Sequence, residues 1–472
     1  MKIAEYTSED RQTTIAPRIP SPMTRRSRPL LLPERTMFRE GRTPFCSVFT
    51  VRLCGSLEEP QLWWALERVQ NKHPLLRCVV DNDALNGPHF VLQEHPAPIP
   101  LRIVERRNEN DWQREARREW VTPFDTGRRP LLRLVWLRSI TVHELLLIGH
   151  HCICDGQSGI ILLRDLLAAC DHPEQGIGAY DALGAMEDIV PADLLRSPRF
   201  QRRVRLKANM LRLAFHLKRA RRGEKPATRI SHEQIYFHRW ALDETWVQSL
   251  TERSRAENVT VLAPLALALM QAFRDVRGAE GLRKTYAMVN ARRFVPRLHP
   301  DALFGIVPGI ELRMKDMPAP REISAGDFWL RARVLKQEMT RRIARLGASV
   351  YNYLAALETL HDKYSRLVAD TENAPAVRHL TISNMGRIDL PQQYRSFRLE
   401  AVYSPLVMVS PTPANTVVLS SFAGQMEFAI MSDEVSLPYA DALKIQQRTM
   451  EILDVCMEKP GLAYKSITEQ RA

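Results

Sequence analysis

The stretch from Gly149 to Gly156 constrains this chain more than any other, because it follows an apolar run and precedes a long apolar segment. Val142 to Ile148 contains four consecutive aliphatic residues, which indicates a mostly buried strand, and a turn signal follows. Residues 158–169 have the pattern of a helix. Because side chains alternate along a strand, His150 and His151 should point to opposite sides, so only one can face a given cavity.

The second histidine is the candidate general base. An imidazole titrates near neutral pH and can take a proton from a hydroxyl, an amine or water. We therefore assign this role to His151. A histidine at a strand end is also commonly a hydrogen-bonded packing residue, and the pair alone does not separate the two interpretations.

The cysteines and histidines of this stretch do not predict a metal site. Structural zinc sites draw ligand pairs from two separated clusters, and no second Cys/His cluster occurs in the sequence. Cys152 and Cys154 are expected to be small buried thiols rather than nucleophiles. Seven cysteines without a paired framework further indicate reduced thiols.

Bulk properties are those of an ordinary globular protein. The 472 residues suffice for roughly two to four domain-sized units, and 45% of them are hydrophobic. No uninterrupted apolar stretch approaches the ~18 residues of a membrane span. The Arg-rich first thirty residues lack the apolar middle of a secretory signal, so we expect a cytoplasmic protein.

The positive charge is local. Between Arg196 and Lys225 there are twelve Lys or Arg and one acidic residue, so this piece carries +11 of the net charge of +13. Leu206, Met210, Leu213 and Leu217 follow helical spacing within it. Three interpretations stay open: a solvated helix between domains, a docking patch for an acidic carrier protein or coenzyme phosphates, and peripheral membrane contact. Nucleic acid is disfavoured, because no binding motif or aromatic interleaving accompanies the charge.

Strands and helices alternate in both halves of the chain, which predicts two α/β or α+β layered units. Strand patterns include 304–312, and helical patterns include 324–345 and 350–360. The expected division is a disordered N-terminal tail, an N-terminal lobe with the histidine motif, a basic linker helix region and a C-terminal lobe, at 1–27, 28–175, 176–230 and 231–472.

Several segments, in their order, resemble the coenzyme-A-dependent acyltransferase superfamily of the chloramphenicol acetyltransferase fold. Nonribosomal-peptide condensation domains, polyketide-associated acyltransferases and alcohol acetyltransferases are similar in appearance. Their His-His-x-x-x-Asp-Gly signature stands intact at residues 150–156. Further segments similar to family landmarks, together spanning roughly residues 28–458, are Leu32 to Phe38, Lys72 to Arg77, Pro123-Phe124-Asp125, Val289 to Arg293, Phe304 to Pro308 and Ile382 to Gly386.

The resemblance implies two lobes forming a pseudo-dimer with a tunnel between them. His151 would face this tunnel and deprotonate an acceptor hydroxyl or amine, which attacks a thioester without an acyl-enzyme intermediate. The Gly156 N–H is a candidate oxyanion donor. His150, Asp155 and Arg292 would support the motif, Asp155 by pairing with an arginine such as Arg292.

For several other residues, the resemblance implies a role but a second interpretation stays open. Arg292 and Arg293 could be solvated surface residues. Asn384 could cap a strand end or line the tunnel, and Ser410 and Thr412 are weaker candidates for the tunnel wall. Pro308 stands where the family usually has Asn, and no Asp-Phe-Gly-Trp-Gly motif of the plant subgroup occurs.

The expected function is a stand-alone acyltransferase that makes an ester or amide. Its substrates would be a small-molecule acyl donor and an alcohol or amine acceptor, with acyl-CoA or a phosphopantetheinyl thioester as donor and no permanently bound cofactor. An acidic acyl or peptidyl carrier protein is a candidate partner. The alternative is a non-catalytic condensation-like module that only recruits such a carrier.

Overall fold

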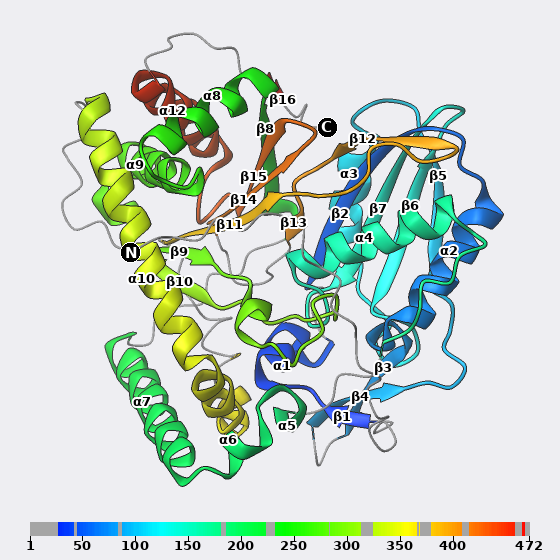
Figure 1. Ribbon diagram of the computed structural model, residues 1–472, viewed down its shortest axis with the longest axis horizontal. Coiled ribbons are helices and arrows are strands. Elements are labelled where there is room, and N and C mark those ends of the chain that lie inside the picture. Colours follow the sequence, from blue (N-terminus) through cyan, green and yellow to red (C-terminus); the bar gives the residue numbers. More distant parts are fainter. Residues whose placement is uncertain are drawn as a thin grey trace, which may run out of the picture.

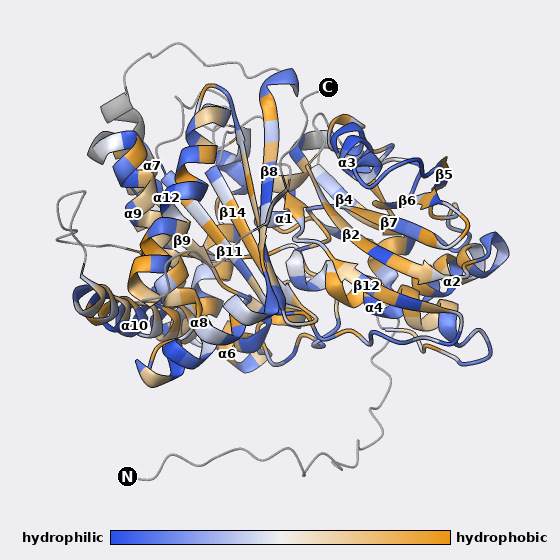
Figure 2. Cartoon of the chain, turned by 90° about the horizontal axis from the view of Figure 1, so that it is seen from above, coloured by the Kyte–Doolittle hydropathy of each residue, from blue (hydrophilic) through white to orange (hydrophobic). Residues whose placement is uncertain are grey.

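The computed structural model describes most of the chain. The described residues are 27–41, 45–83, 87–180, 186–222, 232–282, 284–312, 324–365, 368, 379–407, 415–457 and 465–467. Two lobes of mixed α/β structure stand side by side (Figures 1 and 2). Among the described helices, none combines the length and apolar character needed to cross a bilayer. The predicted fold class, two layered α/β lobes, is confirmed.

The N-terminal lobe is built on a six-stranded sheet. Its strands run in the order β12-β2-β7-β6-β5, with β13 paired to β2 beside this path. The bounds are β2 Cys46–Gly55, β5 Leu101–Glu105, β6 Leu132–Arg138, β7 Val142–His150, β12 Phe397–Val402 and β13 Leu406–Val407. Helices α2 (Glu59–Lys72) and α4 (Gly156–Asp171) pack together, and α4 also contacts β2 and β7. Helix α3 (Asp111–Val121) contacts β2, β6 and β7.

Strand β7 is apolar on both faces because each face of the sheet is covered. Leu145 and Leu147 belong to the core that includes residues of α2 and α4. Leu146 and Ile148 point the other way, into a core shared with strands of the second lobe. The run of consecutive aliphatic residues in the sequence therefore reflects a sheet buried on both sides.

A three-stranded sheet and a short helix complete this lobe. The sheet has the order β1-β4-β3, with β1 at Ser27–Pro29, β3 at Cys78–Asp83 and β4 at Gly87–Leu92. Helix α1 covers Leu32–Phe38. The Arg28 guanidinium and the Glu34 carboxylate form a buried bidentate pair, at 2.7 and 2.8 Å, that joins β1 to α1.

The C-terminal lobe is built on a seven-stranded sheet of order β10-β9-β11-β14-β15-β8-β16. The strands are β8 Ile235–Leu242, β9 Lys284–Met288, β10 Gly309–Leu312, β11 His379–Arg387, β14 Asn415–Phe422, β15 Gln425–Asp433 and β16 Lys465–Ile467. Strand β11 runs parallel to both of its neighbours. The helices are α8 Glu244–Ala256, α9 Leu262–Gly281, α10 Ala325–Glu358 and α12 Tyr439–Met457.

Within the described residues, three helices connect the lobes. They are α5 (Met186–Ile189), α6 (Ala192–Arg196) and α7 (Pro198–Arg222), within the predicted basic linker region. Helix α7 lies alongside α10 on the outer edge of the molecule (Figure 1). Residues 1–26 of the predicted tail lie outside the described residues, and Ser27 begins β1.

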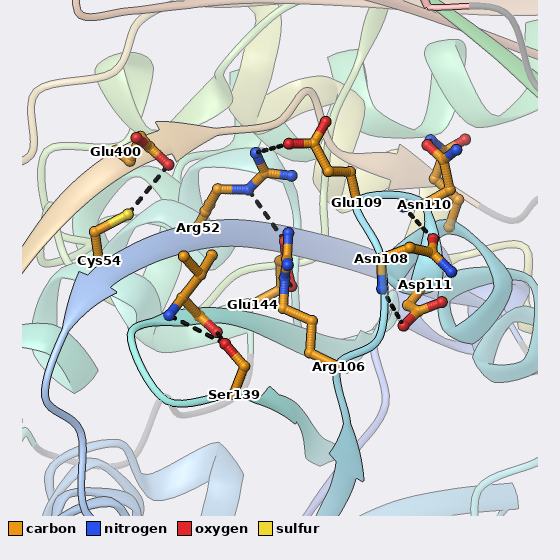
Figure 3. A network of polar contacts seen from close by, with 12 residues as sticks. Arg52, Cys54, Arg106, Asn108, Glu109, Asn110, Asp111, Ser139, Glu144 and Glu400 are labelled. Carbon is orange, nitrogen blue, oxygen red and sulfur yellow. Dashed lines mark hydrogen bonds and ion pairs between the residues drawn. The ribbon is translucent and has the colours of Figure 1, made fainter.

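The two lobes share one sheet. Strands β12 and β13 come from the C-terminal half of the chain but pair antiparallel with β2. Beside this junction, the fully buried Glu144 of β7 accepts from Nε of Arg52 at 3.0 Å and from Nε of Arg106 at 2.8 Å (Figure 3). The Cys54 thiol of β2 donates to Glu400 of β12 at 3.2 Å (Figure 3). Backbone pairing and the hydrogen bond from Cys54 to Glu400 therefore bind the C-terminal strands into the N-terminal sheet.

Two expectations about elements are wrong. The predicted strand 304–312 is a strand only from Gly309, because the backbone at Phe304 is instead hydrogen bonded to the histidine motif. The two helices predicted at 324–345 and 350–360 are one helix, α10. Gly347 lies within this helix with the Phe294 ring packed against it, at a place where a β-carbon would lie 2.5 Å from the ring.

Candidate active site

The histidine motif begins where β7 ends. The backbone N–H of His150 donates to the Leu131 carbonyl at 2.9 Å, and that of His151 donates to the Phe45 carbonyl at 2.7 Å. The backbone is therefore held by neighbouring segments up to His151. As strand alternation requires, the two imidazoles point into different surroundings.

His150 points into the N-terminal lobe. Its ring is 2% exposed and packs against the rings of Phe38 and Phe124, with centroids 6.0 and 5.4 Å away. Its Nδ1 accepts the backbone N–H of Cys152 at 3.3 Å. Burial, with smaller contributions from His151 and Arg133, lowers the pKa of His150 to about 3, so this ring is neutral at physiological pH. Its contacts suit a residue that holds the turn.

His151 lines a cavity of about 230 Å³ and is partly exposed to it. Its ring packs against Phe45, with centroids 5.3 Å apart. Nδ1 is buried and has no hydrogen-bond partner of good geometry in the described part of the chain, which leaves Nε2 to face the cavity. Burial lowers the pKa of His151, partly offset by the backbone carbonyls of His151 and Cys154 and by Asp155. The ring is therefore an unprotonated base at neutral pH.

Asp155 is bound to Arg292 across the lobe boundary. Arg292 Nη1 donates to Asp155 Oδ2 at 2.5 Å, and both side chains are at most 5% exposed. Nη2 of the arginine also donates to Ser158 Oγ at 2.8 Å and to the Ala302 carbonyl at 3.0 Å. Asp155 Oδ1 accepts the N–H and the hydroxyl of Ser158, each at 2.8 Å, and thereby caps α4. Arg292 is thus a buried partner of the motif and not a solvated surface residue, whereas Arg293 is exposed.

The loop before β10 docks directly on this cluster. The Phe304 N–H donates to Ser158 Oγ at 3.1 Å, and the Phe304 carbonyl accepts the Asp155 N–H at 3.2 Å. At Gly305 a β-carbon would lie 2.5 Å from the Cys152 carbonyl and 2.7 Å from that of His151. Only glycine allows the loop this close to the motif.

Gly156 is the first residue of α4, and its N–H is one of the amides that a helix leaves unpaired at its start. A β-carbon there would lie 2.4 Å from Sδ of Met385 and 2.7 Å from Cε. The side chain of Met385, from β11 of the other lobe, therefore rests on Gly156. A larger residue at this position would require the end of the Met385 side chain to move.

The cavity lies between the two lobes and takes its walls from both. Its polar lining comes from Gln157, Asn290, Thr381, Ser383, Asn384 and Thr416, beside His151 and Asp155. Its apolar lining comes from Phe49, Met288, Val307, Met385, Pro405, Val407 and Val418. Two larger hollows on the N-terminal lobe do not include the motif. We place the site at the smaller cavity, because it holds the perturbed histidine.

Of the residues predicted to line the tunnel, the structure places one at the cavity and does not describe the other two. Asn384 lines the cavity, and its Oδ1 also accepts the Gly386 N–H at 3.0 Å, so it both faces the cavity and braces a bulge in β11. Ser410 and Thr412 lie outside the described residues. Cys152 and Cys154 are fully buried, and burial raises the pKa of both thiols, so they do not supply a nucleophile.

Sequence reasoning gave no role to three residues that the structure brings to the site. Ser158 lies at the centre of the Asp155 cluster, and its position three residues after the helix cap is a recognisable signal. Met385 and Asn290 line the cavity from β11 and from just after β9. Both lie in segments that resemble family landmarks, but the sequence does not show that they line the cavity, because their place depends on how the lobes meet.

Comparison with known proteins agrees with this architecture. Residues 37–179 match the family model described as Condensation domain. Chondramide synthase cmdD from Chondromyces crocatus is 30% identical over 145 residues, which are 28% of this chain and 4% of that synthase. This chain therefore matches only a small part of the length of such a relative.

Solved structures match over nearly the whole chain. TRI3 trichothecene 15-O-acetyltransferase from Fusarium sporotrichioides aligns with a TM-score of 0.69 and 12% identity, over 92% of this chain and 96% of that one. The condensation domain of the monacolin K polyketide synthase MokA aligns with a TM-score of 0.64 and 13% identity, over 92% and 98%. At such low identity the likeness shows the fold.

These matches confirm the resemblance inferred from the motifs. Residues 37–179 carry the sequence pattern of condensation domains, and 92% of the chain aligns with the chloramphenicol acetyltransferase-like fold that condensation domains share with acyltransferases.

Proposed function

We propose that this protein is an acyltransferase that moves an acyl group from a thioester to a hydroxyl or amine, with His151 as the general base. The observation that supports this proposal is that a partly exposed histidine, whose pKa is lowered by burial, faces a cavity walled by both lobes. The donor would be an acyl-CoA or an acyl group on the phosphopantetheine arm of a carrier protein.

The proposed reaction needs one proton carrier. His151 Nε2 takes the proton of the acceptor O–H or N–H as the acceptor atom bonds to the thioester carbonyl carbon. The tetrahedral intermediate then collapses, the C–S bond breaks, and the histidine returns the proton to the departing sulfur. Products are an ester or amide and a free thiol, so no acyl-enzyme and no metal ion enter the scheme.

The surrounding groups suit the charges of this reaction. The Gly156 N–H at the start of α4 is a candidate donor to the developing oxyanion, because helix N-termini present unpaired amides and a positive dipole end. Asp155 is bound by Arg292 and Ser158, so both of its carboxylate oxygens are engaged in the structural cluster. His150 accepts a hydrogen bond from the Cys152 N–H and so stabilises the turn.

The test supplies labelled acyl-CoA and labelled acyl-carrier protein with a panel of alcohols and amines. His151→Ala should lower transfer by about 10²–10⁴-fold, the usual contribution of a general base. His95→Ala, at an exposed histidine of the same lobe, is the control and should transfer as well as the unmodified protein.

Equal transfer by the unmodified protein and His151→Ala would remove the proposed role of the histidine. If neither protein transfers an acyl group but both bind acyl-carrier protein, the chain is a recruiting module and the enzymatic proposal fails. The donor comparison also shows whether coenzyme A or a carrier protein brings the acyl group.

A further inference from the structure

Helix α7 carries an exposed row of large apolar side chains. Leu206, Met210, Leu213 and Leu217 are 56, 68, 59 and 49% exposed. Their spacing of four, three and four residues places them on one side of a helix that turns 100° per residue. We call these four side chains the outer row. It extends over about 16 Å of the helix surface.

The opposite side of α7 accounts for its packing. Ala208 is 2% exposed, and Leu211 packs against a small core that includes Leu360 and Tyr364, just beyond the end of α10. Arg212 Nη2 donates to the Thr359 carbonyl at 2.7 Å. The helix is therefore held to the protein by its inner face, and the outer row is not needed for that attachment.

Basic side chains surround the outer row. Helix α7 contains ten Lys or Arg and no Asp or Glu in 25 residues. Arg202, Arg203 and Arg205 are exposed, and none has an acidic partner within the described part of the chain. Long basic side chains beside an apolar stripe can keep their charges in a headgroup layer while the apolar groups enter the acyl boundary.

We propose that the outer row and the basic residues beside it form a docking surface for an anionic phospholipid bilayer. The charge is of one sign, and it complements the negative surface potential of such a membrane. Helix α7 lies along the outer edge of the molecule, on the side of α10 away from the two large sheets (Figure 1).

The position of α7 favours a membrane over an acidic carrier protein. A carrier must insert its prosthetic arm into the cavity, whose walls come from strands such as β2, β11 and β14. Helix α10 stands between α7 and these strands (Figure 1). A bilayer has no such requirement, because it needs only an accessible convex edge.

The experiment measures co-sedimentation of the full chain with vesicles of phosphatidylcholine alone and of phosphatidylcholine with phosphatidylglycerol. The chain should bind the anionic vesicles at low salt and release them at about 1 M salt, where the Debye length falls to about 3 Å. Arg203→Gln with Arg205→Gln should weaken binding on the order of 30-fold, because each basic residue near such a surface contributes about 1 kcal/mol.

The apolar contribution is tested separately. Leu206→Gln with Leu213→Gln should weaken vesicle binding at least on the order of tenfold, through loss of buried apolar area. The matched control is Leu330→Gln with Val334→Gln, which removes two equally exposed apolar residues, four apart, from the distant first turns of α10. This control should bind as the unmodified protein does, and circular dichroism should show that all variants are folded.

Three results would overturn the proposal: equal binding to neutral and anionic vesicles, equal loss in the α7 and α10 variants, or no vesicle binding at all. An acidic acyl carrier protein added without vesicles forms a further arm. If only the carrier binds, and the α7 variants abolish that binding, the surface belongs to a protein partner instead.

Discussion

Adjacent histidines with opposite surroundings define the chemistry of this chain at the scale of single residues. His150 is enclosed by aromatic rings and has a pKa of about 3, whereas His151 reaches a cavity. Strand alternation alone predicts that the two rings diverge, and this holds. The contact of Ser158 with Phe304 and that of Met385 with Gly156 could not be predicted in this way, because each joins segments more than 100 residues apart.

The burial of His150 should make folding stability depend on pH. Its pKa of about 3 lies below the usual 6.5, so between these values the unfolded chain binds more protons than the folded one. The free energy of unfolding should therefore fall as pH falls through this window. Between pH 6.5 and 5, the titration of His150 should lower the free energy of unfolding by about 2 kcal/mol.

Urea unfolding at pH 6.5 and 5 measures this loss. His150→Asn keeps a hydrogen-bond acceptor near the position of Nδ1 but removes the titrating ring. The free energy of unfolding of this variant should therefore fall less between pH 6.5 and 5 than that of the unmodified protein. Burial also lowers the pKa of His143 and His238, so some loss should remain. His95→Asn, at an exposed site, should lose as much as the unmodified protein. An undiminished loss in His150→Asn would contradict the assignment.

At the scale of elements, one ion pair joins the start of α4 to the loop before β10. Arg292 contacts Asp155, Ser158 and the loop carbonyls at the same time. The apolar pattern of 304–312 predicted a strand throughout, but the first half of that segment serves as a docked loop. Local pattern identifies α4 and β7 well because their own core contacts create the pattern, whereas a loop held by distant polar groups leaves no such periodicity.

Removing either partner of the Asp155–Arg292 ion pair should destabilise the folded protein. Asp155→Asn and Arg292→Met should each lower the free energy of unfolding by about 3–5 kcal/mol, because each leaves a buried charge without its partner. The double variant should lose less than the sum of the two, as a double-mutant cycle by urea unfolding would show. Arg398→Met, at an exposed pair with Glu400, should change stability little. Strictly additive losses would mean that the two groups act independently.

At the scale of the whole molecule, the lobes form a single structure through β12 and β13. These strands belong by sequence to the second lobe but complete the sheet of the first, and β13 also borders the cavity. The alternation of strands and helices in the second half of the chain did not predict the partner of β12, because nothing local to a strand specifies pairing with β2 some 350 residues earlier.

Gly55 offers a test of this junction. It ends β2 opposite Phe397 with a φ of +131°, where a β-carbon would lie 2.5 Å from the Ser396 carbonyl and 2.7 Å from the α-carbon of Phe397. Gly55→Ala should cost about 1–3 kcal/mol through backbone conformation alone, with a further cost from the collision. Hydrogen exchange should speed up in β12 first, because that strand must move to admit the methyl group.

Gly326→Ala is the matched control, since the first turn of α10 has open space there and the substitution favours a helix. Its exchange in β12 should match that of the unmodified protein. Because β12 leads into the strand that carries Val407, Gly55→Ala should also reduce acyl transfer more than the control does. If Gly55→Ala leaves exchange in β12 and stability unchanged, the crossing strands do not hold the lobes together as this geometry requires.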